Sequence, residues 1–297
     1  MKLFLVALAI AGQGGKVLFS DLSRSFVVRS ARNATIDPVK GSSDYSFTLD
    51  GNCRVEQNAR GIVMLADHMD GVAVRTPDNN YSIGQGNATG NVDFVFDSAN
   101  AAKFNNSPSR PDHLSDHFEL TSDAAKLATE ADLQSITLPH PFKAVDHRVG
   151  LTNDADHSPY VEDMTYTASS GKFFFIPAEG STPAKLQTGS FEGPVHIHMV
   201  KTLNVPEKPP VVTDYDVTGD RMTFDFTKLV GEVVITGNVH WKVEGGYGGN
   251  GDADKVTINT DAELKPTGIH MVGEPTTSQL IFPPEPVTAK PKTKGSG

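Results

Sequence analysis

Short runs of alternating hydrophobic and polar residues recur along most of the chain. They end in glycine, asparagine, aspartate or proline, and the clearest runs are residues 25–28, 45–49, 92–96, 172–176, 222–226 and 232–235. Successive side chains of a strand point to opposite faces, so this alternation is typical of strands that are buried on one side. Closely spaced turn residues favour antiparallel pairing. The pattern therefore predicts an all-β protein.

Four runs share one register, counted from a preceding glycine. The glycines are Gly51, Gly90, Gly193 and Gly237, which begin the sequences GNCRVEQ, GNVDFVF, GPVHIHM and GNVHWKV. Hydrophobic residues recur at every second position after the glycine: Cys53, Val55, Val92, Phe94, Phe96, Val195, Ile197, Met199, Val239, Trp241 and Val243. The residues between them are mostly polar: Arg54, Glu56, Asp93, His196, His198, His240 and Lys242. The shared register predicts one buried apolar face and one outward polar face.

A second pattern, a small residue followed by aspartate, comes after the glycine pattern. It occurs in LADHM at 65–69, in LTSDAAKL at 120–127 and in DADKVTI at 252–258. The predicted unit is a Gly-Asn turn, an alternating strand, a loop, the small residue with aspartate, and a second strand. Gly51 and Gly90 are 39 residues apart, and Gly193 and Gly237 are 44 apart. One such unit cannot bury its own apolar face, whereas stacked units share a continuous interior.

Two stretches depart from the strand pattern. Residues 113–134 are rich in good helix formers and carry Leu and Phe at near-helical spacing, so a short helical insertion is the alternative to a strand there. Residues 244–252 read EGGYGGNGD, which favours a long flexible hairpin loop.

The two ends differ from the body of the chain. Residues 1–11 combine Lys2, a short apolar stretch and small residues, which predicts a secretory signal peptide; an apolar first strand is the alternative. Residues 283–297 are rich in proline and lysine and predict a disordered tail. The protein is therefore expected to be exported.

Charge and cysteine content narrow the function classes. The 297-residue chain has a net charge of −10 and no lysine and arginine cluster in its body, which argues against a nucleic-acid partner. Its one cysteine, Cys53, excludes a disulfide framework and cysteine-rich metal sites.

The repeated motifs resemble the OstA-like proteins of bacterial lipopolysaccharide export, both the soluble periplasmic bridge protein and the inner-membrane-anchored subunit. The resemblance covers residues 51–96 and 224–282 well and residues 120–199 loosely. The sequence departs from the family pattern at three places. These are the insertion between Phe96 and Leu120, residues 139–185, and the hydrophobic N-terminal segment, which is shorter than a membrane anchor.

The resemblance implies a long antiparallel repeat stack, folded into an open V-shaped β-jelly roll. The implied parts are two OstA-like β modules at 16–100 and 191–282, with a β module carrying insertions at 101–190 between them. The implied function is periplasmic: shielding the acyl chains of lipopolysaccharide, or a similar envelope lipid, on the way to the outer membrane. The implied partners are that lipid and, through end-to-end strand association, the protein itself or other transport components.

The resemblance therefore makes the apolar face a candidate lipid-binding groove, whereas the register by itself favours the dry core of an ordinary β-protein. The predicted groove residues are Val55, Val92, Phe94, Phe96, Val195, Ile197, Met199, Val239, Trp241 and Val243. Two alternatives stay open: a secreted all-β carbohydrate-active enzyme or carbohydrate-binding domain, and a structural β-repeat protein without a small ligand. No Gly-x-Ser-x-Gly motif is present and Cys53 sits at an inward position, so no catalytic residue, enzyme activity or cofactor is predicted.

Three groups of residues have some character of metal ligands. His196 and His198 have the spacing that places two imidazoles on one strand face, and the register adds His240 to that face. The other two groups are the helically spaced pair His113 and His117, and the acidic loop carrying Asp154, Asp156 and Asp163. Neither a zinc motif nor a calcium loop is complete, so a polar surface is the preferred interpretation and no metal is predicted.

Overall fold

Strands form nearly all of the described structure. The computed structural model describes residues 19–20, 27–57, 62–75, 81–97, 117–130, 133–152, 158–176, 185–204, 207, 209–228, 230–245, 248–260, 266–273 and 277–281. The predicted signal peptide and the predicted tail lie outside these residues. Within them no helix is found, and hence none that could cross a membrane. The predicted all-β class is confirmed.

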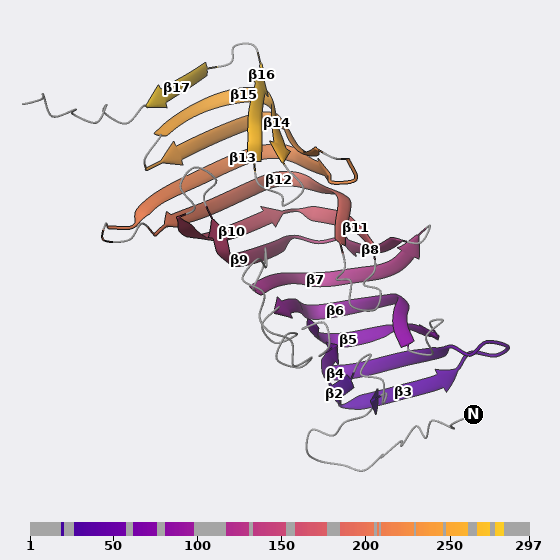
Figure 1. Ribbon diagram of the computed structural model, residues 1–297. Coiled ribbons are helices and arrows are strands. Elements are labelled where there is room, and N and C mark those ends of the chain that lie inside the picture. The colour runs from indigo at the N-terminus through magenta and orange to yellow at the C-terminus, as the bar shows by residue number, and fades with distance from the viewer. Residues whose placement is uncertain are drawn as a thin grey trace, which may run out of the picture.

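Seventeen strands are described, and they join into one sheet through antiparallel pairings (Figure 1). They are β1 (Phe19–Ser20), β2 (Val27–Ser30), β3 (Asn33–Pro38), β4 (Tyr45–Gln57), β5 (Ile62–Arg75), β6 (Tyr81–Asp97), β7 (His117–Glu130), β8 (Leu133–Leu138), β9 (Phe142–Thr152), β10 (Pro159–Ala168), β11 (Ser170–Ile176), β12 (Lys185–Leu203), β13 (Val211–Asp225), β14 (Gly231–Glu244), β15 (Gly248–Thr260), β16 (Pro266–Val272) and β17 (Thr277–Ile281).

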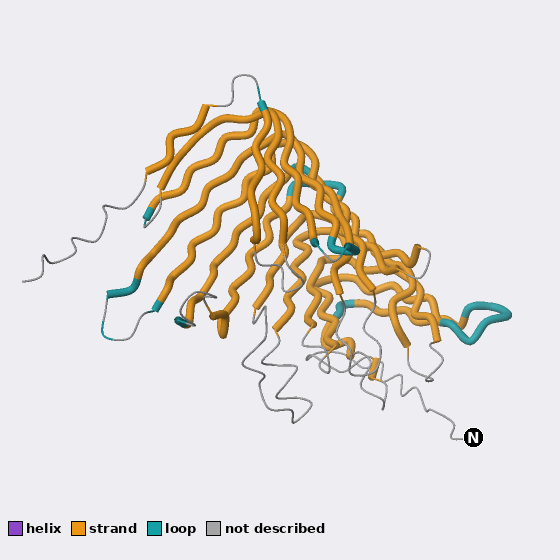
Figure 2. The backbone as a smooth tube through the Cα atoms, turned by 45° about the horizontal axis from the view of Figure 1, so that its top comes forward, coloured by secondary structure: helices purple, strands orange, loops and turns teal. Residues whose placement is uncertain are grey.

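The long strands β4 to β7 and β12 to β15 each bend once near the middle, and the bends align into a ridge (Figure 2). Four other positions in the sheet are each occupied by two shorter strands, one on either side of the ridge, in place of one long bent strand. These pairs are β2 with β3, β8 with β9, β10 with β11, and β16 with β17. Each bent strand pairs with the next one along the chain, so the connections alternate between the two free margins. The fold is a meander folded lengthwise.

The fold line divides the sheet into two walls. Wall A contains β3, β8, β11, β16 and residues 45–50, 68–75, 81–89, 124–130, 185–192, 221–225, 231–236 and 255–260 of the long strands. Wall B contains β1, β2, β9, β10, β17 and residues 53–57, 62–66, 92–97, 117–122, 195–203, 211–218, 239–244 and 248–253. In the view of Figure 2 the two walls descend from the ridge on opposite sides, as in an inverted V.

The Gly-Asn motifs form the bends and lie inside the strands, not ahead of them as the sequence suggested. Gly90 and Asn91 have φ values of 72° and 48°, and Gly237 and Asn238 have 75° and 46°. In each case the register shifts, because two residues of one strand lie opposite one residue of its neighbour. Such a bulge turns the strand while the hydrogen-bonded ladder continues on both sides.

The small residue with aspartate forms the neighbouring part of the same corner. The Asn91 side-chain amide donates to Asp67 at 2.8 Å, and the Asn238 amide donates to Asp220 at the same distance. The carboxylate packs so closely that a Cβ on Gly237 would lie 2.4 Å from Asp220 Oδ2. At the first corner the two sequence patterns thus form one structural device; at the second, the partner is Asp220, which follows Gly219 and was not in the predicted segments.

The expected interruptions of the repeat do not interrupt the fold. Between β6 and β12 the ridge continues through corners that lack the Gly-Asn pair, for example at Ser169, between β10 and β11. The alternative of a helix within residues 113–134 is wrong for the described part, because β7 pairs with β6 on one side and with β8 and β9 on the other. Sheet pairing of this extent overrides the helix propensity of the alanines and leucines. The expected loop at 244–252 is also shorter, because β15 begins at Gly248.

The predicted register of buried positions is confirmed near the ridge. Val92, Val195 and Val239 are 2%, 1% and 0% exposed, and Cys53 is 1% exposed. Edge-to-face contacts of phenylalanine rings link the walls at the centre, where Phe142 of wall B lies 5.0 Å from Phe191 of wall A between ring centroids.

The outer face is polar as predicted, with one difference. His240 and Lys242 are exposed, whereas Glu56 is buried, because Arg29 and Arg54 both donate to its carboxylate at 2.8 and 2.7 Å. Asp93 is half-buried, and burial, followed by the nearby Glu119, raises the pKa of its carboxyl.

A glycine-to-alanine pair tests the corner. Gly237→Ala should lower the free energy of unfolding by about 3 kcal/mol, because it adds a clash with Asp220 to the backbone strain of a positive φ. Gly41 has a φ of 81°, and no atom lies within 4 Å of the place that an alanine Cβ would take, so Gly41→Ala should cost only about 1 kcal/mol. Urea unfolding midpoints give both values, and equal losses would contradict the role of Asp220.

Candidate functional site

The candidate site is the seam, defined as the space between the inward faces of walls A and B. Its lining is apolar along the whole ridge, from Val28 and Leu49 near the N-terminal end to Val239 and Val256 near the C-terminal end. Inward positions are hydrophobic because alternate residues of every strand point to the same side of a folded sheet.

Exposure of the predicted groove residues increases away from the ridge. In wall B the residue nearest the ridge is fully buried in each case, and the next inward residues, Phe94, Phe96, Ile197, Met199 and Val243, are only partly buried. Val55 and Trp241 are 7% and 8% exposed. The structure therefore brings all ten predicted residues to one interior whose lining becomes accessible toward the open margin.

The seam contains a small pocket near its N-terminal end. This pocket, lined by Phe47, Met64, Met69, Ile83 and Leu127 among others, encloses about 30 Å³, room for about two water molecules. That volume is too small for an acyl chain, so any chain bound there requires the walls to separate.

Charged residues face inward at the centre of wall B, which the sequence patterns did not predict. Arg148 donates to Glu162 at 3.1 Å, and both residues are 7% exposed. The Lys201 ammonium lies 3.8 Å from the centre of the Tyr160 ring. The alternation of residues in β10 could have predicted the inward position of Glu162, because it places Glu162 on the same face as Tyr160 and the buried Ala168.

Two partly buried tyrosines, Tyr166 and Tyr215, adjoin this ion pair. The Tyr166 hydroxyl donates to the Met164 sulfur at 3.1 Å, and burial raises the pKa of that phenol, as Asp146 also does. Burial, followed by Glu162, likewise raises the pKa of Tyr215. These phenols stay neutral and serve as hydrogen-bonding groups at ordinary pH.

The outer face carries histidines paired with carboxylates of neighbouring strands. His196 contacts Asp216 at 2.7 Å, and His198 contacts Asp214 at 3.0 Å. The same arrangement recurs for His147 with Asp163, His117 with Asp97, and His240 with Asp252. The candidate metal ligands His196, His198 and His240 thus each have a separate carboxylate partner, and among the described residues no group of three potential ligands converges on one point. Residues His113, Asp154 and Asp156 lie outside the described residues.

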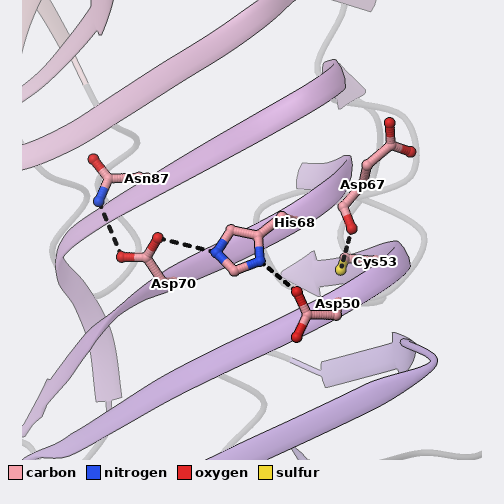
Figure 3. A network of polar contacts seen from close by, with 6 residues as sticks. All are labelled: Asp50, Cys53, Asp67, His68, Asp70 and Asn87. Carbon is pink, nitrogen blue, oxygen red and sulfur yellow. Dashed lines mark hydrogen bonds and ion pairs between the residues drawn. The ribbon is translucent and has the colours of Figure 1, made fainter.

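His68 is the most connected of these histidines (Figure 3). Its Nδ1 lies 2.6 Å from Asp50 and its Nε2 lies 3.3 Å from Asp70, which accepts a hydrogen bond from Asn87. Nearby, the Cys53 thiol donates to the Asp67 backbone carbonyl at 3.6 Å. Burial, followed by the charge of Asp50, raises the pKa of Cys53, so this thiol is not activated as a nucleophile.

Comparisons with protein-family models, with curated proteins and with solved structures find no match to this chain.

The His68 cluster predicts a pH-dependent stability difference. The hydrogen bond that His68 donates to the Asp50 carboxylate raises the pKa of His68 above its usual 6.5, so the stabilisation is complete below pH 6.5 and is lost as pH rises through the folded-state pKa. His68→Gln should therefore cost more at about pH 5.5 than at about pH 8.5, by less than about 1 kcal/mol because the ring is part exposed. Chemical unfolding at both values measures this, and a larger cost at the higher pH would contradict it.

The inward ion pair should be far more sensitive than an outer one. Arg148→Met leaves the Glu162 carboxylate buried without that cation, which should cost about 3–5 kcal/mol. The control is Arg221→Met on the outer face, where Arg221 pairs with Glu192 at 2.9 Å with both side chains about half exposed; the expected cost is below about 1 kcal/mol. Similar losses in urea unfolding would show that the Arg148 pair is not buried.

Proposed function

We propose that this protein is an exported, non-enzymatic carrier of lipid acyl chains, and that the chains of lipopolysaccharide or a similar envelope lipid occupy the seam during transport to the outer membrane. The observation that carries the proposal is the gradient of exposure along wall B, from fully buried valines at the ridge to partly exposed Phe94, Ile197 and Val243 toward the margin. A groove open along one side has such a lining.

The hydrophobic effect supplies the drive for this binding. Each methylene group transferred from water to an apolar site contributes about 0.8 kcal/mol. Because the pocket at the N-terminal end of the seam is too small for an acyl chain, part of that gain is offset by separating the walls there. The polar outer face stays hydrated meanwhile, since its histidines and carboxylates already pair with one another. A lipid bound in this way would keep its sugar head at the open margin.

The ends of the sheet support association with a second chain. At the C-terminal end the described pairings of β16 are with β15 alone, and at the N-terminal end those of β3 are with β4 alone. Ile269 and Val272 of β16 are 60% and 51% exposed. Unpaired strand edges with apolar residues favour the addition of another strand. We therefore include end-to-end association, with itself or with another transport component, in the proposed function.

Site-specific photo-crosslinking tests the proposed function. A photoreactive phenylalanine analogue at Phe94 should crosslink to purified lipopolysaccharide, because this side chain faces the seam and is partly accessible. The control position is Lys242, whose side chain is 56% exposed on the outer face; Asp93 is unsuitable because it is half-buried. Equal labelling at both positions, or none in protein that circular dichroism shows to be folded, would refute the carrier function.

A further inference from the structure

Two buried polar groups in the C-terminal half of the seam have no hydrogen-bond partner among the residues that the structure describes. One is the indole N–H of Trp241 on wall B, and the other is the hydroxyl of Thr260 on wall A. The residues are 8% and 4% exposed. Among the described residues the one other such atom is an oxygen of Asp93, which belongs to the opposite face of its strand. Buried polar groups are nearly always paired, so each exception requires an explanation.

The position of Trp241 explains why the protein offers it no acceptor. The alternation of β14 directs Trp241 inward, like the fully buried Val239 two residues before it. Its neighbours across the sheet are Val217 on β13 and Gly251 on β15, neither of which has a polar side chain. Wall A lines this part of the seam with hydrophobic residues: Val233, Ile235, Val256, Ile258 and Met271.

Two glycines of β15 adjoin this part of β14. Gly251 lies directly opposite Trp241, and Gly249 lies directly opposite Val243. Because glycine has no side chain, neither residue can offer a side-chain acceptor to the indole.

We propose that Trp241 recognises the carbonyl oxygen of an acyl ester or amide in the bound lipid. The indole nitrogen can only donate a hydrogen bond, so the ligand must supply an acceptor. Every acyl chain that is linked to its head group by an ester or amide has a carbonyl oxygen at that link, and this oxygen is a strong hydrogen-bond acceptor. The inference rests on the proposed function and deepens it: the ligand class is acyl-linked lipid, in preference to ether-linked lipid or plain hydrocarbon.

A matched pair of lipids tests this directly. The probes are 1-monolauroylglycerol, which has an ester carbonyl, and 1-O-dodecylglycerol, which has the same chain length and head with an ether link. The wild-type protein should bind the ester about tenfold more tightly, because only the ester satisfies the buried donor. Trp241 is the only tryptophan of the chain, so its emission should shift to longer wavelength with the ester and not with the ether.

Two variants complete the experiment. Trp241→Phe keeps an aromatic ring and removes the donor, so calorimetric titration should show equal affinity for the two lipids. Thr260→Val removes the other unpartnered group, at the end of wall A away from the ridge, and should leave the preference for the ester unchanged; if Trp241→Phe does not fold, the emission of Trp241 in the wild-type protein still tests the contact.

The outcomes separate this inference from the proposed function. Equal binding of both lipids by the wild type, or a preference for the ester that persists in Trp241→Phe, would overturn the role of Trp241 and leave a carrier that does not sense the linkage. Failure of the folded wild-type protein to bind either lipid would remove the carrier function itself, and the role of Trp241 with it.

Discussion

The bend that the strands make at the ridge is the constraint on which the rest of the structure depends. A flat meander of this length would expose one apolar face to water, and folding it lengthwise sets that face against itself. The bend requires positive φ values at two successive residues, which Gly90 and Asn91 of β6 adopt, and it is braced by the Asp67 carboxylate of the preceding strand, β5. Glycine is needed because the carboxylate occupies the place of a Cβ, whereas asparagine tolerates the left-handed region.

The ridge also determines which chemistry each residue position can have. Inward residues next to the ridge are almost completely buried, whereas in β6, β12 and β14 residues farther from it, such as Phe94, Ile197 and Val243, remain partly accessible. The seam consequently varies along its length: a small apolar pocket lies near the N-terminal end, the Arg148 and Glu162 pair lies at the centre, and the unpartnered Trp241 lies toward the C-terminal end. Such variation would let different parts of one amphiphilic ligand meet different surroundings.

The polar face follows a simpler rule. Histidine and carboxylate residues on neighbouring strands lie within contact distance, as in His68 with Asp50 and His196 with Asp216 (Figure 3 shows the first). Because most of these side chains are about half exposed, the individual pairs contribute little to stability. Their effect is to keep the outer face hydrophilic, which disfavours face-to-face packing of this face against another sheet.

The sequence by itself determined the all-β class and the inward set of residues, since a period of two and a shared register survive in any sheet that buries one face. It placed Val92, Val195 and Val239 in the interior for that reason. The residues of the corner were visible as two separate motifs, but the sequence could not show that Asn91 meets Asp67, 24 residues before it, because that contact exists only once neighbouring strands pair.

Only the tertiary structure decided the remaining points. Residues 117–130 are a strand because β6 and β9 supply hydrogen-bond partners that local propensity does not encode. Glu162 is buried because Arg148, on another strand, neutralises it. Trp241 was correctly placed inward from the sequence, yet its lack of an acceptor became apparent only when the opposite wall was in place. Alternation fixes the face on which a side chain lies, whereas pairing across walls fixes what it meets there.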